Sequence, residues 1–331
     1  MNRRVLALSA GLVGALAIVS PPRVLRLVAS AEAQSAGAWS PARTAWGDPD
    51  LQGRYTNVYE NGTPFERPAE FEGRRLEDVK GEELAAIRRG IQEQTISRFL
   101  GPIHAPENWW QDNLFLERGS QAWFVVDPAD GKIPALTSAA EARQARRAAA
   151  RRNSGRGPAD SYEDRSLYDR CISRGLPGSM LPAIYGNQYQ IVQAPGYVAI
   201  LYEMIHETRI IPIDGGPHVA PGIRTHMGDA RGHFQGDTLV VETTNFKDEV
   251  AYRGADAATL RLIERFTPTG PDKLTWAVTV DDPATWTSPW TFAMPLTLDD
   301  QPFPAYECHE GNYGLRNILS AARAEESAGK E

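Results

Sequence analysis

The sequence predicts a mainly β protein, in which an antiparallel meander closes into a lipocalin-like barrel after a helical N-terminal part. Short runs rich in β-branched and aromatic residues follow one another from Tyr189 to Cys308, and tight turns separate them. Two of these runs alternate apolar with polar residues, as strands with one buried face do. Closing the meander into a barrel removes unpaired sheet edges. A two-sheet sandwich is the alternative arrangement.

The helical part lies in the N-terminal half of the chain. Residues 75–99 carry apolar side chains three to five positions apart, with acidic residues early and Arg88-Arg89 later, which predicts an amphipathic helix. Residues 139–152 are rich in Ala and Arg and predict a second, basic helix. Between these helices, residues 123–126 and 132–136 flank a turn and predict a β-hairpin.

The predicted barrel strands occupy the C-terminal half. Gly236-Asp237 separates two apolar runs and is a strong signal for a hairpin. The strands expected at residues 273–280 and 290–297 alternate most clearly. Such alternation is typical of an antiparallel sheet with one buried and one solvated face. The residues that share the apolar faces are Leu274, Trp276, Val278 and Val280 on the first strand, and Trp290, Phe292, Met294 and Leu296 on the second.

The N-terminus predicts a signal peptide over residues 1–33. Arg3 and Arg4 precede an uncharged apolar stretch at residues 5–19, and Ala31-Glu32-Ala33 offers the small residues that a signal peptidase needs. The apolar stretch is shorter than the about 20 residues of a membrane span. The arginine pair also fits a twin-arginine signal, so both export routes stay open. We expect a periplasmic or secreted protein with no stable membrane insertion after cleavage.

The mature chain divides into a strand, helix and linker region at residues 34–158 and a β-barrel-like domain at residues 159–331. The formal charge of the chain is -7, and cleavage removes four arginines and one glutamate, which makes the protein more acidic. An acidic protein is a poor partner for nucleic acid, so we expect no nucleic-acid partner. Cys171 and Cys308 are the two cysteines, and in an oxidising compartment they predict a disulfide. Two buried free thiols are the alternative.

Several sequence blocks carry a resemblance to known proteins. They are Glu163–Leu167, Arg170–Ile172, Arg174–Gly178, Glu203–His206, Gly236–Phe246, Asp282-Pro283 with Trp286 and Pro289-Trp290, and Glu307–Tyr313. Together they resemble a widespread family of exported bacterial proteins of unassigned function, from about Trp46 to Glu326. The resemblance implies no activity. The hairpin at residues 236–246 is also similar to those of lipocalin-type barrels, which concerns the fold alone.

The familiar catalytic motifs do not occur in the sequence. It contains no His-Glu-x-x-His, no Cys-x-x-Cys, no phosphate-binding glycine loop and no Gly-x-Ser-x-Gly. Their absence argues against common hydrolases and nucleotide enzymes. Five histidines lie between residues 206 and 309, but their spacing matches no metal signature. We therefore expect neither a metal site nor a cofactor.

Three clusters of polar residues lie at predicted strand ends, at residues 203–209, 224–233 and 307–313. Ionisable side chains that are held in place can act as general acids or bases. The alternative is that these residues only fix loops by hydrogen bonds. The candidate catalytic residues are His206, Asp229, Arg231, His309 and Glu310.

Each candidate has an expected role. His206 and His309 would exchange protons with a substrate, and Arg231 would stabilise a developing anion. Asp229 or Glu310 would orient a histidine. These roles require that the three clusters meet in space.

A second group of residues is expected on the inner face of the barrel. Glu264 lies on an apolar strand face, so it needs a partner or has a raised pKa, and an arginine partner would make it structural. The aromatic residues of this face could line a ligand cavity or simply form the core. The candidate ligand-binding residues are Tyr189, Glu264, Trp276, Trp286 and Trp290.

Two functions follow from these candidates. The first is a periplasmic enzyme that uses metal-free acid–base chemistry, as a lyase, isomerase or hydrolase, on a small and partly apolar organic molecule. The alternative is a non-catalytic, lipocalin-like protein that binds a small apolar ligand. The sequence leaves open whether the protein is an enzyme.

Overall fold

The structure is a computed structural model that describes residues 39–103, 116–183 and 185–328, with the side chains of residues 98–103 left out. The predicted signal peptide lies outside the described residues. The elements belong to one unit, Ser40–Glu331. Its longer helices are α1 (Gly81–Ile103), α3 (Ser138–Asn153) and α4 (Tyr313–Ala328).

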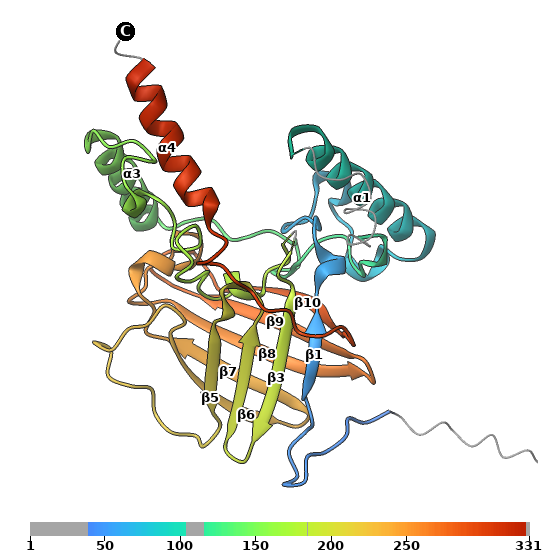
Figure 1. The fold of residues 1–331 in the computed structure, drawn as a ribbon. Helices are drawn as coiled ribbons and strands as arrows, with labels where there is room; N and C mark the ends of the chain where they lie inside the picture. Colours follow the sequence, from blue (N-terminus) through green and yellow to red (C-terminus); the bar gives the residue numbers. More distant parts are fainter. Residues whose placement is uncertain (1–38, 104–115, 184, 329–331) are drawn as a thin grey trace, which may run out of the picture. The chain divides into compact units, whose positions relative to one another are not determined.

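Ten strands form a single antiparallel sheet (Figure 1). Its hydrogen-bonded order is β5-β4-β3-β1-β10-β9-β8-β7-β6, and β2 pairs with β10. The sheet therefore consists of two meanders, β3 to β5 and β6 to β10, which β1 joins. The strands are β1 (Gly53–Thr56), β2 (Val125–Asp127), β3 (Gln188–Ala194), β4 (Tyr197–Tyr202), β5 (Thr208–Pro212), β6 (Asp229–Gln235), β7 (Thr238–Thr244), β8 (Arg261–Gly270), β9 (Lys273–Asp281) and β10 (Trp290–Leu298).

The sheet curves into a nearly closed barrel, because its two end strands, β5 and β6, lie side by side without a hydrogen-bonded ladder. Every pairing along the nine-strand path is antiparallel, so β5 and β6 run in the same direction. Parallel neighbours need a long crossover instead of a hairpin, and residues 213–228 supply it. The prediction of a mainly β antiparallel barrel is confirmed.

The interior of the barrel follows the predicted alternation. On β9 and β10 the register places Trp276 opposite Met294 and Val278 opposite Phe292, and these four side chains are buried. Burying such large apolar side chains removes them from water and contributes about 1.5–3 kcal/mol each. The core therefore lies inside the barrel and needs no second sheet.

The disulfide prediction is also confirmed. Cys171 and Cys308 are bonded, with their Cα atoms 5.8 Å apart, across a sequence separation of 137 residues. The bond fixes the segment that leads into α4 to the loop around Cys171. Such bonds persist in oxidising compartments.

Two predicted elements are wrong: the strand expected at residues 306–308 does not form, and neither does the hairpin at residues 123–136. Residues 132–136 form no strand and therefore no hairpin with residues 123–126. Instead β2 pairs with the start of β10, where Thr291 lies opposite Asp127. That end of β10 is available because β1 pairs only with Thr297 and Leu298 at its other end.

The observed helices match the predicted helices in part. The predicted helix at residues 139–152 is observed as α3, and its N-terminus is capped by Thr137, which accepts a hydrogen bond from the Ala140 backbone. The helix expected from residue 75 begins at Gly81 as α1. Helix α4 was not predicted. No helix within the described residues is long and apolar enough to cross a membrane.

Candidate functional site

A polar groove lies where the barrel is not closed by hydrogen bonds, between β5 and β6. We call it the seam groove; its volume is about 410 Å³. It brings together residues of the first and second predicted clusters, which the sequence alone could not place side by side. Its lining includes Glu207, Thr208, Arg209 and Ile210 from one side, and His226, Met227, Asp229 and Arg231 from the other.

Asp229 contacts a histidine, His218, that is not among the candidates predicted from the sequence. The Asp229 carboxylate lies 2.7 Å from His218 Nδ1 and accepts a hydrogen bond from the Val219 backbone at 3.0 Å. The other ring nitrogen, Nε2, lies 3.2 Å from Glu242. An ionised carboxylate can accept a hydrogen bond but cannot donate one. Both contacts are therefore hydrogen bonds only when both ring nitrogens of His218 carry a proton. His218 is thus held between two acids at the rim of the barrel.

This cluster continues across the outer face of the sheet. Arg231 lies 3.5 Å from Asp229 and donates to the Pro217 backbone, so it fixes the crossover loop to β6. Arg261 bridges Glu242 at 3.1 Å and Asp281 at 2.6 Å. These groups are partly exposed, and the pairs between exposed groups contribute little stability each. Arg261 thereby holds Glu242 in place beside His218.

Inside the barrel, behind the seam groove, Arg209 and Glu264 form a buried ion pair. Arg209 Nη2 donates to Glu264 Oε1 at 3.1 Å, a second contact joins Arg209 Nη1 to Oε2, and Trp276 Nε1 donates to Oε1 at 3.1 Å. Burial raises the pKa of the neighbouring Tyr202 phenol, which therefore stays neutral. The arginine partner that we considered for Glu264 is present.

His206 lies at the turn between β4 and β5, outside the seam groove lining. Ile205 and His206 both have positive φ angles, 65° and 54°, a conformation that β-branched residues rarely adopt. The Tyr306 backbone donates to His206 Nε2 at 3.2 Å. The strained turn therefore presents His206 to Tyr306, which lies just before the third predicted cluster.

His309 and Glu310 lie in the exposed turn that follows Cys308. His309 borders a pocket with Arg170 and Asn312. Within the described residues no hydrogen bond or ion pair joins His309 to His206. The five candidate catalytic residues therefore lie in three separate places, with Asp229 beside Arg231 and His309 next to Glu310, and their catalytic roles stay predictions.

The candidate ligand-binding residues are all part of the barrel core. Tyr189, Trp276 and Trp290 are fully buried, and Trp286 packs edge to face on Trp290 at 5.6 Å. The pockets that we describe are lined by other residues. A role in ligand binding stays a prediction.

Among the described residues, no three His, Cys, Asp or Glu side chains converge as they would around a metal ion.

Sequence reasoning missed His218 and Glu242 as members of the site. Both were visible as polar residues beside predicted strands, but which histidine Asp229 contacts depends on the path of the crossover loop. On β7, Glu242 lies between buried Val241 and buried Thr243 and points away from the core.

Comparisons with known proteins add little to this geometry. No family model and no curated protein matches the sequence. Among solved structures, a secretary abundant heat soluble (SAHS) protein from Ramazzottius varieornatus matches with 11% identity and a TM-score of 0.26. The match covers 40% of this chain and 87% of that protein. Values this low carry no argument about fold or function.

Proposed function

We propose that the protein binds a small organic molecule in the seam groove without chemically changing it. The observation that carries this proposal is the groove itself, a recess between β5 and β6, two neighbouring barrel strands that share no ladder. Unpaired backbone groups at strand edges are available to a ligand. Ligand sites typically combine apolar walls with a few placed polar groups.

The lining indicates the class of ligand. Exposed Ile210 and partly buried Met227 offer apolar surface, whereas Asp229 and Arg231 offer an acceptor and a donor that are already fixed by their neighbours. Preorganised polar groups lose little conformational entropy on binding. A partly apolar molecule with one polar end fits these walls.

The test is native mass spectrometry of protein purified from the periplasm. Thr208→Trp places a large side chain in the groove, and Val192→Trp makes the same change at an exposed site on β3, outside the groove lining. We expect a bound small molecule on the wild type and on Val192→Trp, but not on Thr208→Trp. Retention of the molecule by Thr208→Trp at equal folded content contradicts the proposal.

A second candidate function is acid–base catalysis, and the Asp229–His218 contact favours it. A histidine oriented by a carboxylate is the arrangement that general bases use. The test is consumption of a component of a periplasmic metabolite extract, followed by mass spectrometry. Turnover that His218→Gln abolishes, while ligand binding and folding persist, supports the enzyme; turnover unchanged in His218→Gln and His309→Ala rejects both histidines.

We also propose export with cleavage after residue 33, in line with the family that the sequence resembles. The Cys171–Cys308 disulfide supports an oxidising destination. N-terminal sequencing of the protein from a periplasmic fraction tests the cleavage, and an intact N-terminus contradicts it.

A further inference from the structure

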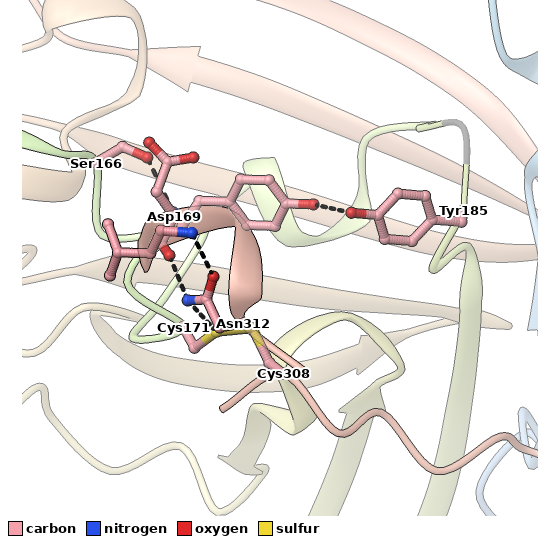
Figure 2. The surroundings of a disulfide bond; sticks show 8 residues. Ser166, Asp169, Cys171, Tyr185, Cys308 and Asn312 are labelled. Carbon is pink, nitrogen blue, oxygen red and sulfur yellow. Dashed lines mark hydrogen bonds between the residues drawn. A yellow bond between two sulfur atoms is a disulfide. The ribbon is translucent and has the colours of Figure 1, made fainter. Parts of the chain in front are cut away.

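A second pocket, of about 360 Å³, lies beside the disulfide and shares no lining residue with the seam groove. Figure 2 shows its surroundings, in which Tyr185 faces the loop that carries Asp169 and Cys171. We call it the tyrosine pocket. Its walls come from three distant segments, and they include Tyr168, Tyr185, Tyr306, Asp169 and Glu307.

The walls of the tyrosine pocket are fixed to one another. The disulfide joins the two main segments, and Asn312 Nδ2 donates to the Asp169 backbone oxygen at 2.8 Å (Figure 2). Asn312 Oδ1 also accepts a hydrogen bond from the Leu315 backbone at the start of α4. A pocket with cross-linked walls is preorganised, which lowers the entropic cost of binding.

Three phenol rings gather in this pocket, and two of them, Tyr168 and Tyr306, stay uncharged. The hydroxyls of Tyr168 and Tyr185 are 3.1 Å apart and hydrogen-bonded. Burial raises the pKa of Tyr168, as does the bond to Tyr185, and burial also raises the pKa of Tyr306. Neutral aromatic rings carry partial negative charge on their faces, and these faces attract cations.

The charges of the lining are negative. It contains Asp169 and Glu307 but no Lys, Arg or His among its described residues. Asp169 is paired with Arg165 at 3.1 Å, whereas Glu307 has no ion pair within the described part of the chain. The Arg174 guanidinium carbon lies 5.2 Å from the Tyr168 ring centre, so this ring already binds one cation.

We propose that the tyrosine pocket binds an organic cation of the quaternary ammonium class, with the cation against the tyrosine faces and near Glu307. Such a group cannot donate a conventional N–H hydrogen bond, so aromatic faces and a nearby carboxylate are its natural partners. The ring of Tyr185, which is 48% exposed, offers the accessible face. This site is independent of the function proposed for the seam groove.

The test is titration of the full mature chain with choline by calorimetry. The control ligand is the neutral carbon isostere of choline, in which a quaternary carbon replaces the nitrogen. We expect choline to bind with a Kd in the millimolar range or below and the isostere to bind about two- to thirty-fold more weakly, since a cation over aromatic rings gains about 0.5–2 kcal/mol.

Variants of Tyr185 separate the cation from other ligands. Tyr185→Phe keeps the aromatic face and should change the Kd of choline less than about two-fold, whereas Tyr185→Leu should weaken binding about three- to thirty-fold. Tyr197→Leu, which alters a tyrosine of equal exposure on β4, should have no effect. Absence of choline binding, equal binding of the isostere, or a loss in Tyr185→Phe as large as in Tyr185→Leu overturns the proposal; the last outcome indicates a hydrogen-bonded neutral ligand such as a sugar.

Discussion

Arg209 and Glu264 pair inside the barrel and thereby join β5, the edge strand that lacks a ladder with β6, to β8. Both side chains are almost completely buried. The pair supplies a side-chain link where the backbone supplies none. The integrity of the seam groove therefore depends on a contact in the core.

Breaking this pair should be costly. In Glu264→Gln the amide oxygen can still accept from Trp276 Nε1, but the Arg209 cation is left unpaired, and we expect a loss of roughly 3–5 kcal/mol in the free energy of unfolding. Adding Arg209→Met should restore a large part of the loss, because no buried charge remains. Urea unfolding of both variants measures this. A double variant no more stable than the single one contradicts a charge-based cost.

Trp290 tests whether the aromatic residues are core or ligand walls. Its ring packs against Phe65 at 5.9 Å and Phe292 at 6.0 Å. Trp290→Ala should therefore lower the free energy of unfolding by about 3–5 kcal/mol in the absence of any ligand. Trp46→Ala, at a 39% exposed tryptophan, should change it by less than about 0.5 kcal/mol. A small effect of Trp290→Ala would indicate open space around the ring.

Reducing the disulfide should destabilise the fold. A bond across 137 residues restricts the unfolded chain strongly, and the chain-entropy model gives about 4–5 kcal/mol. We expect the double variant Cys171→Ala/Cys308→Ala to unfold at a lower urea concentration than the oxidised wild type. A reducing agent should lower the urea midpoint of the wild type but not that of the variant. Equal midpoints for the oxidised protein and the variant contradict the stabilising role.

Glu60 should make stability depend on pH. Its carboxylate accepts hydrogen bonds from the Ser120 backbone and hydroxyl, and burial raises its pKa, although Arg88 lowers it in part. In the unfolded chain the pKa of a glutamate is about 4.3. Between that value and the native pKa the native state binds more protons, so the contribution of Glu60 is complete at low pH and is lost as pH rises.

The measurement compares the free energy of unfolding of the wild type and Glu60→Gln as a function of pH. The glutamine keeps an oxygen that accepts from Ser120 but does not titrate. The stability of the wild type relative to the variant should fall as pH rises from about 4.3 through the native pKa of Glu60. Parallel curves for the two proteins contradict a raised pKa.

Most of the strands were predictable from local sequence, because a period of two residues between apolar side chains shows directly which face of a strand is buried. On β9 and β10, every second residue from Leu274 to Val280 and from Trp290 to Leu296 is buried, as the alternation indicates. The disulfide was also predictable, since the chain has two cysteines and a predicted export signal. The inward direction of Glu264 followed from the same alternation.

Which polar residues meet depends on how the chain folds in three dimensions. His218 reaches Asp229 and Glu242 because the crossover loop must return along the barrel between two parallel end strands, and no local pattern specifies that path. For the same reason β2 pairs with a free stretch of β10 instead of forming a local hairpin. Local periodicity reports burial, whereas contacts between distant side chains depend on how the barrel closes, and that closure is a property of all the strands together.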